Sequence, residues 1–480
     1  MTGPSWSRRA LCAAAISSLV MIIPVSSGVA GAIPPPVIDP GAVPDPLPLG
    51  PELPLRQEHV CTPSGLMPDT DLGAPTASQA FMDIPALWQS AGRGAGQTIA
   101  MVDTGVNVSP RLPHVHGGGD YVDEAANGLQ DCDAHGTVVA SILGAQPSQT
   151  DGLVGVVPDA DIISIRQSSE AWVPVNPSSA DVEADRRAGT VSSLAKAVVL
   201  AANTGAKVMN ISIVSCIPVL KPVDQTTLGA AIRYAAVDKD MVVVAAGGNL
   251  GGAGCAQNPD IDATSAKDPR NWNGVVTIST PAWFSDYVLS VSATDGSGQP
   301  AVDTNNREIS LSGPWIGAAA PGVFIEGLDD KGGVMNATFD ARAGVLRPIN
   351  GTSFAAPYVS GLAALIRSKY PNLTAAQVIR RIEATAHSPA ASPQDVAGGA
   401  VVDNRMGYGA IDPVAALNYD VPLGPAQPVE HLTRPLHPPP PPPPPDHRPM
   451  IVALVGAGTA VGVLVTLFFI ATVTRKRRQA

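Results

Sequence analysis

Residues 351–369 read GTSFAAPYVSGLAALIRSK and place Ser353 at the start of a long, mostly apolar run. The apolar positions recur with helical spacing, so we predict a helix over residues 352–368. Ser353 then lies at a helix N-terminus, where free backbone N–H groups favour developing negative charge. A serine in such a place is most often only an N-cap, so the stretch indicates chemistry only if it has partners elsewhere in the chain.

Two other short stretches supply those partners. Asp103 follows the apolar run TIAMV (residues 98–102) and begins DTG, and His135 begins HGT. Taken singly, an aspartate after a strand is commonly a turn residue, and such a histidine can be polar surface. Together the three residues occur in the order Asp, His, Ser, which is that of subtilisin and not that of chymotrypsin or the α/β-hydrolases. No G-x-S-x-G motif surrounds Ser353, which argues against an esterase of the lipase type.

These three residue types fit acyl transfer. A serine hydroxyl is a poor nucleophile until a neighbouring base accepts its proton, and His135 can do so before it passes the proton to the leaving amine. Asp103 can hold the imidazole in one tautomer and stabilise its positive form. We therefore predict that Asp103, His135 and Ser353 form a catalytic triad.

The stretches resemble the signatures of the subtilisin-like (S8) serine proteases: DTGV at 103–106, HGTV at 135–138 and GTSFAAP at 351–357. The resemblance implies an endopeptidase that cleaves protein substrates. VAAGGN at 244–249 is similar to the family segment with the oxyanion-hole asparagine, which assigns that role to Asn249, although an asparagine after two glycines is usually a turn residue. The Ser353 N–H is the second donor. By resemblance, residues 210–213 pair as an edge segment with an extended substrate.

The ends of the chain make the resemblance to the mycosins, the membrane-anchored proteases of mycobacterial type VII secretion systems, more specific. An Ala-rich leader, a Pro-rich extension, a proline spacer and one C-terminal apolar run occur together, and DCDAHGT (131–137) and GYGAIDP (407–413) resemble mycosin stretches. The resemblance implies a cell-envelope location and partners in the secretion membrane complex. Segment 33–60 is too short and too Pro-rich for a folded pro-domain, so we expect it to wrap permanently around the protease.

Between residues 98 and 386, strand patterns alternate with helix patterns. We predict strands at 98–102, 162–165, 208–211 and 241–245, and helices at 138–143, 191–202, 228–237, 352–368 and 375–386, the last capped by Thr374. Alternation of this kind predicts an α/β, subtilisin-like fold: a mostly parallel sheet with helices on both faces, plus one C-terminal transmembrane helix. In such sheets the catalytic groups lie beyond the carboxyl ends of the strands.

Both ends of the chain carry membrane signals. Arg8 and Arg9, an apolar run and AGA at 30–32 predict a signal peptide, with an uncleaved anchor as the alternative. The uncharged run at 451–474 is long enough to cross a bilayer, and basic residues 475–478 follow it. The predicted parts are a signal peptide (1–32), a Pro-rich extension (33–60), a peptidase domain (61–420), a Pro-rich linker (421–449), a transmembrane helix (450–474) and a cytoplasmic tail (475–480).

Four cysteines remain after the predicted signal peptide, an even number that favours disulfides in an exported protein. Cys216 and Cys255 each closely follow a parallel strand and should lie at the same edge of the sheet, so we pair them. Cys61 is then left for Cys132. The pairing ties the N-terminal extension beside the His135 loop.

Other features argue against cofactors and nucleic acid. The net charge is −11 and no long basic stretch lies inside the chain, so nucleic acid is not an expected partner. The cysteine spacings fit no zinc motif, and segment 145–153 has too few acidic side chains for calcium, so no metal or other cofactor is expected. We interpret Asp131 and Asp133 as polar loop residues.

The leading hypothesis is thus an active serine endopeptidase, anchored by one span, with its catalytic domain outside the cytoplasm and its C-terminal tail inside. The alternative is a structural component of the secretion complex whose protease site is dispensable. The two functions are compatible with each other. The intact triad and Asn249 favour activity, because decay commonly replaces at least one such residue.

Overall fold

The computed structural model describes residues 33–176, 182–252, 254–261, 265, 267–303, 305–340, 343–387, 402–432 and 448–477. The chain divides into a first unit that ends at Thr433 and a second that begins at Arg434. The predicted signal peptide, the proline run at 438–445 and residues 478–480 lie outside the described residues.

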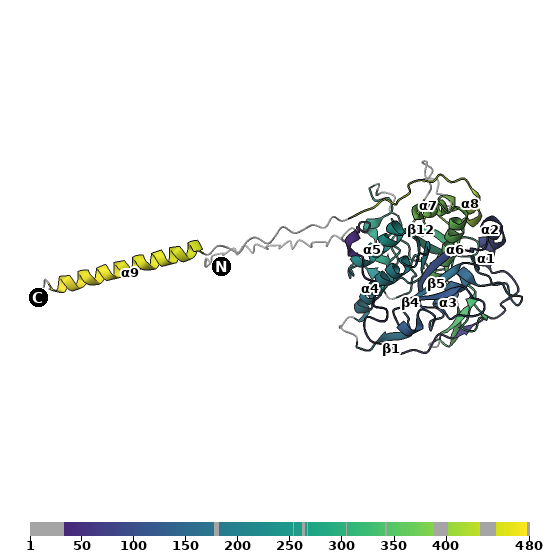
Figure 1. The fold of residues 1–480 in the computed structure, drawn as a ribbon, viewed down its shortest axis with the longest axis horizontal. Coiled ribbons are helices and arrows are strands. Elements are labelled where there is room, and N and C mark those ends of the chain that lie inside the picture. Colours follow the sequence, from purple (N-terminus) through teal and green to yellow (C-terminus); the bar gives the residue numbers. More distant parts are fainter. Residues whose placement is uncertain are drawn as a thin grey trace, which may run out of the picture. The chain divides into compact units, whose positions relative to one another are not determined.

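A seven-stranded parallel sheet forms the centre of the first unit, in the order β12-β11-β9-β7-β3-β5-β4 (Figure 1). Its strands are β3 (Thr98–Asp103), β4 (Val115–Asp120), β5 (Asp161–Arg166), β7 (Val208–Ile211), β9 (Val242–Ala246), β11 (Val288–Thr294) and β12 (Ile316–Pro321).

The apolar strands are buried on both faces, because helices cover each side. Successive side chains of a strand point to opposite faces. In β3, Ile99 and Met101 therefore belong to one hydrophobic core, and Ala100 and Val102 belong to the other. Burial of this kind is what allows a strand such as β9 to read as a continuous apolar run, VVVAA.

Helices α3 (His135–Gly144) and α6 (Thr352–Lys369) pack on one face of the sheet, and α4 (Val182–Ala202) and α5 (Thr226–Arg233) lie on the other (Figure 1). A capping box at Thr374 begins α7, as the sequence predicts. The remaining helices of this unit are α1 (Ala77–Met82), α2 (Ile84–Ala91), α7 (Ala375–Thr385) and α8 (Pro413–Asn418).

Small antiparallel sheets join the N-terminal extension to the body. Strand β1 (Leu55–Gln57) pairs with β6 (Trp172–Pro174), and β2 (Ser64–Gly65) pairs with β15 (Ala337–Asp340), which also pairs with β16 (Val345–Pro348). Two further antiparallel pairs join β8 (Ser215–Pro218) to β10 (Thr277–Thr280) and β13 (Gly327–Leu328) to β14 (Val334–Met335).

The packed unit extends beyond the predicted peptidase domain, 61–420, on both sides. Ile38 is buried among the side chains of α5 and Phe284, and its N–H donates to the carbonyl of His431 at 2.8 Å. Arg233 of α5 pairs with Glu430 at 2.6 Å. The segments predicted as extension and linker thus meet on the surface of α5.

Most predicted elements are present, with shifted ends. Helix α3 begins at His135 and not at 138, and the helix predicted at 228–237 is α5 followed by a π-helical turn over 234–238. The interpretation of residues 210–213 as an edge segment is wrong, because β7 lies between β3 and β9. Ser212 is the first residue beyond the end of β7, and the chain enters β8 at Ser215.

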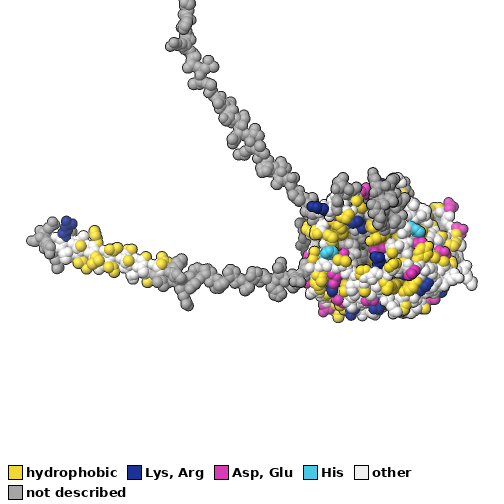
Figure 2. Space-filling view, turned by 90° about the horizontal axis from the view of Figure 1, so that it is seen from above, with side chains coloured by type: hydrophobic (Ala, Val, Ile, Leu, Met, Phe, Trp, Pro, Cys, Tyr) yellow, Lys and Arg dark blue, Asp and Glu magenta, His cyan; other side chains and the backbone are white. Residues whose placement is uncertain are grey.

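The second unit contains helix α9 (Arg448–Arg477). Within Ala453–Arg475, the most apolar stretch of 18 residues has a mean hydropathy of 2.3, and none of that stretch is buried inside the protein. Figure 2 shows hydrophobic side chains along its described part. By length and composition this helix can cross a membrane, as the sequence predicts.

We predict that Ile38→Ala lowers the free energy of unfolding by about 2–4 kcal/mol, because it leaves a cavity in the core that joins the extension to α5. The neighbouring Val37 is 51% exposed, and Val37→Ala is expected to change stability by no more than about 0.5 kcal/mol. Thermal unfolding of the full chain in detergent measures both. Equal melting temperatures for the two variants would show that the extension adds no stability.

Candidate active site

The carboxyl ends of three neighbouring strands bring the predicted site residues together. β3 ends in Asp103, β7 is followed by Ser212, and β9 leads through two glycines to Asn249. Because β9, β7 and β3 are adjacent and parallel, these residues share one edge of the sheet. Helices α3 and α6 begin at the same edge and add His135 and Ser353.

Asp103 and His135 form a short hydrogen bond, with 2.7 Å between Oδ1 of the carboxylate and Nδ1 of the imidazole. Asp103 is fully buried, and the same oxygen accepts from the N–H of Thr104 at 2.7 Å. Since a carboxylate only accepts, Nδ1 carries the proton and Nε2 is left as the basic nitrogen. The ring of Phe354 lies against the imidazole with 5.0 Å between centroids and limits its movement.

The pKa of His135 is raised above its ordinary value. Burial alone disfavours the charged imidazolium and lowers this pKa, but the nearby carboxylates, of which the hydrogen-bonded Asp103 has the largest effect, together more than offset burial. The charges of Asp131 and Asp133 act in the same direction. The site therefore stabilises the imidazolium that forms when His135 accepts a proton.

Ser353 is almost fully buried, and its hydroxyl donates to the carbonyl of Ser212 at 2.9 Å. The Ser212 hydroxyl in turn donates to the carbonyl of Ser353 at 2.7 Å. Between the described residues Ser353 and His135 there is no hydrogen bond; the hydroxyl is turned toward β7. Bonds between a nucleophile and its base are often long without substrate and shorten in the reactive complex.

The amide of Asn249 has a fixed orientation. Its Oδ1 accepts from the N–H of Thr352 at 2.9 Å and from the Thr352 hydroxyl at 3.1 Å. That hydroxyl also accepts from the N–H of Gly248 at 3.2 Å. Both donors bind the oxygen, so Nδ2 of Asn249 remains available beside the turn that carries Ser353. An N–H donor in this place, with the Ser353 N–H in the first turn of α6, can stabilise an oxyanion.

Asp131 lies in a loop, as the sequence predicts, but its burial was not predicted: the residue is 5% exposed and its carboxylate is held by hydrogen bonds. The contacts of Thr104, Ser212 and Thr352 with other site residues were not predicted from the sequence. Serine and threonine are common at turns and helix starts, so only their position beside a motif residue could have singled them out.

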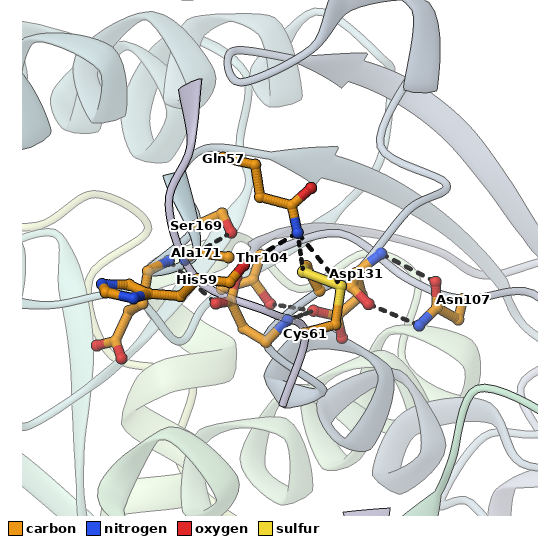
Figure 3. Close-up of a disulfide and its surroundings, with 11 residues drawn as sticks. Gln57, His59, Cys61, Thr104, Asn107, Asp131, Ser169 and Ala171 are labelled. Atoms are coloured by element: carbon orange, nitrogen blue, oxygen red, sulfur yellow. Dashed lines mark hydrogen bonds between the residues drawn. A yellow bond between two sulfur atoms is a disulfide. The ribbon is translucent and has the colours of Figure 1, made fainter. Parts of the chain in front are cut away.

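The four cysteines pair as the sequence predicts. Cys61 bonds to Cys132, three residues before His135, and Cys216 bonds to Cys255. Figure 3 shows the first disulfide beside Asp131 and Thr104. Cys216 lies in β8, which pairs with β10 outside the parallel sheet.

Among the described residues, no group of three or more His, Cys, Asp or Glu side chains could hold a metal ion. An apolar cavity of about 370 Å³ lies between the extension and β8, is lined by Ile38, Trp283 and Phe284, and contains none of the predicted site residues. The predicted site residues lie instead at the carboxyl edge of the sheet.

Comparisons with known proteins agree with this geometry. The subtilase family pattern matches residues 94–409. Mycosin-1 of Mycobacterium tuberculosis is 47% identical over 434 residues, which cover 89% of this chain and 92% of that protein. The crystal structure of MycP1 from the ESX-1 type VII secretion system is similar with a TM-score of 0.77 and 45% identity, covering 84% of this chain and 100% of that chain. A chain of an intact ESX-5 inner membrane complex is similar with a TM-score of 0.76 and 43% identity, covering 92% and 100%.

Fold, site geometry and these matches define the class as a subtilisin-like serine protease. The chain belongs to the subtilase family and, within it, to the mycosins. The predicted family, fold class and activity are thereby confirmed. The domain boundaries and the individual roles of the site residues stay predictions.

Proposed function

We propose that Asp103, His135 and Ser353 are the catalytic triad of a serine endopeptidase and that Asn249 forms its oxyanion hole. The observation that carries the proposal is the short Asp103–His135 hydrogen bond at the strand edge where Ser353 begins α6. The raised pKa of His135 suits a base that is stabilised once it has gained a proton.

In this mechanism, substrate displaces the Ser353 hydroxyl from the Ser212 carbonyl toward Nε2 of His135. Ser353 Oγ attacks the peptide carbonyl carbon while His135 takes the hydroxyl proton, and Asp103 stabilises the resulting imidazolium. The negative oxygen is stabilised by Nδ2 of Asn249 and the Ser353 N–H. His135 then gives its proton to the leaving amine, and water hydrolyses the acyl-enzyme by the same steps in reverse roles.

Labelling by a serine-reactive fluorophosphonate tests these roles without a known substrate. The full chain should be labelled and Ser353→Ala should not, because the attacking oxygen is absent. Asn249→Ala should still be labelled but more slowly, since its donor acts on the developing charge. A loss of roughly 10²-fold is expected, which is the size of effect known for the oxyanion-hole asparagine of a subtilisin.

Circular dichroism of each variant confirms that the fold is kept. Labelling of Ser353→Ala at the rate of the unchanged chain would remove Ser353 from the mechanism. Asn249→Ala that reacts as fast as the unchanged chain would remove Asn249 from the oxyanion hole.

We also propose that the catalytic unit lies on the outer side of the inner membrane and that the C-terminal tail is cytoplasmic. Support comes from the apolar helix at Ala453–Arg475, the one candidate span within the described residues. It also comes from two disulfides that suit an oxidising compartment, and from similarity to a chain of the periplasmic assembly of an ESX-5 inner membrane complex.

Protease added to intact spheroplasts should digest the catalytic unit and spare an epitope tag at the C-terminus, because the bilayer shields only the tail. Spheroplasts opened with detergent, in which the tag becomes accessible, are the control. Loss of the tag in intact spheroplasts would contradict this topology.

A second function, as a structural member of a type VII secretion membrane complex, is favoured by similarity to a chain within the ESX-5 inner membrane complex over 92% of this chain. The Ser353 hydroxyl distinguishes the two functions, because proteolysis requires it and a structural role does not. In cells that lack the chain, Ser353→Ala should restore assembly of the complex. Complex assembly that requires the unchanged serine would argue that proteolysis itself is needed.

A further inference from the structure

Asp131 is a buried carboxylate that the catalytic steps above do not use. Its Oδ1 accepts from the Thr104 hydroxyl at 2.9 Å and from the N–H of Asp133 at 3.0 Å. Its Oδ2 accepts from the hydroxyl of Thr137 at 2.7 Å and from the N–H of the same residue at 2.8 Å. Both oxygens are thus fully engaged, and four donors converge on one side chain.

Three of those donors belong to the segments that carry the catalytic pair: the Thr104 hydroxyl beside Asp103, and the hydroxyl and N–H of Thr137 in the first turn of α3. Thr104 follows Asp103, and its hydroxyl also accepts from the N–H of Gly136, which follows His135, at 2.9 Å. One hydroxyl therefore joins the turn of β3, the start of α3 and Asp131. A methyl group on Gly136 would lie 2.1 Å from the carbonyl oxygen of Gly105, so the two turns are in direct contact.

Asp131 is itself held from outside the site. Asn107 binds its backbone at both ends: the Asp131 N–H donates to Oδ1 at 3.0 Å, and its carbonyl accepts from Nδ2 at 2.7 Å (Figure 3). The next residue, Cys132, is bonded to Cys61 of the extension side, and its carbonyl accepts from the N–H of Thr62 at 2.8 Å. The carboxylate consequently has little freedom to move.

The side-chain chemistry at this position is specific. An ionised carboxylate accepts at both oxygens, whereas an amide of the same shape offers one acceptor and one donor group. Burial raises the pKa of Asp131 to about 6, with the hydrogen bonds from Thr137 and Thr104 opposing this rise. A buried charge costs free energy unless it is paired or fully hydrogen-bonded. Here the four groups that donate to the Asp131 carboxylate offset that cost.

From this geometry we propose that Asp131 is a positioning residue: its carboxylate orients the Thr104 hydroxyl and through it holds Asp103 and His135 in register. The inference rests on the proposed catalytic roles of Asp103 and His135. Asp131 contacts neither substrate nor the reacting atoms. Its effect on them is transmitted by the hydroxyl of Thr104 and, through space, by its negative charge.

The negative charge of Asp131 gives a second way to test the proposal, through the pKa of His135. The groups that face His135 are the carboxylates of Asp103, Asp131 and Asp133, and all three raise its pKa. Arg166 is fully buried, with its Nη1 3.9 Å from Asp120, and its positive charge acts to lower the pKa of Asp133. Asp131→Asn removes one of the three negative charges, so His135 should lose its proton at lower pH, and the acid limb of the pH–rate profile should move to lower pH.

The test is the second-order rate constant of fluorophosphonate labelling against pH for the full chain in detergent. Asp131→Asn should lower the high-pH plateau by roughly ten- to a hundredfold, because misalignment of the catalytic pair slows attack. It should also move the acid limb to lower pH. Asp133→Asn is the matched control: Asp133 binds the N–H of Glu170 at 3.0 Å and none of the Thr104 or Thr137 groups, so its plateau should be unchanged.

Variants of Thr104 distinguish a loss of positioning from a failure to fold. Thr104→Val removes the hydroxyl and keeps Asp131; it should lower the plateau as much as Asp131→Asn, and Thr104→Ser should restore it. Combining Asp131→Asn with Thr104→Val should add little to either loss, since both act through one bond.

A plateau for Asp131→Asn within about twofold of the unchanged chain, which is below any misalignment effect, would overturn the proposal. So would a lowered plateau with an unmoved acid limb, which indicates a structural role alone. If circular dichroism shows that Asp131→Asn is unfolded, Thr104→Val decides, and labelling of Thr104→Val at the unchanged rate overturns the proposal. If the unchanged chain itself is not labelled, the proposed catalytic roles fail instead.

Discussion

The hydrogen bond between Asp103 and His135 is the constraint around which this edge of the protein is organised. It joins the last residue of a central strand to the first residue of a helix, and it places a carboxylate where water has no access. An isolated buried carboxylate is costly, so the surroundings must supply donors for it and hold the imidazole in place. The Thr104 N–H donates to Oδ1, the oxygen that also binds His135, and the Phe354 ring and the contact between the two turns hold the imidazole. Oδ2 has no hydrogen-bond partner among the described residues.

The N-terminal extension also contacts the part of the protein that holds this edge. Its strand β1 pairs with β6, and the residues just after it bond to Cys132 beside the His135 loop and pair with β15, whose partner β16 leads to the Ser353 turn. The extension and the residues that follow it thus contact segments near the His135 and Ser353 motifs. That this segment stays as a permanent wrap around the protease remains a prediction.

The site is arranged for stabilisation of charge more than for a preformed nucleophile. Asn249 is fixed by Thr352, and the His135 pKa is raised. In the proposed mechanism these groups are the oxyanion donor and the proton acceptor, and both are in place before substrate arrives. Ser353 alone is turned away, toward the carbonyl of Ser212. Preorganised donors require no rearrangement during the reaction, whereas a hydroxyl can rotate about a single bond at small cost.

The sequence by itself determined the class of fold, the family and the three motifs, because short-range patterns encode them. Apolar runs predict strands, helical spacing predicts α6, and the order Asp, His, Ser with its neighbouring residues identifies the protease class. The same local logic predicted the capping box at Thr374 and, from the ends of two strands, the pairing of Cys216 with Cys255.

Only the tertiary structure decided which polar residues are buried and which strand is central. Asp131 reads as a loop residue, and its burial arises where the turns of β3 and α3 meet. From the sequence, residues 210–213 could belong to an edge strand or to a central strand. The strand order of the sheet places β7 between β9 and β3. Both outcomes depend on contacts between segments far apart in the chain, and such contacts leave no periodic mark on the residues that make them.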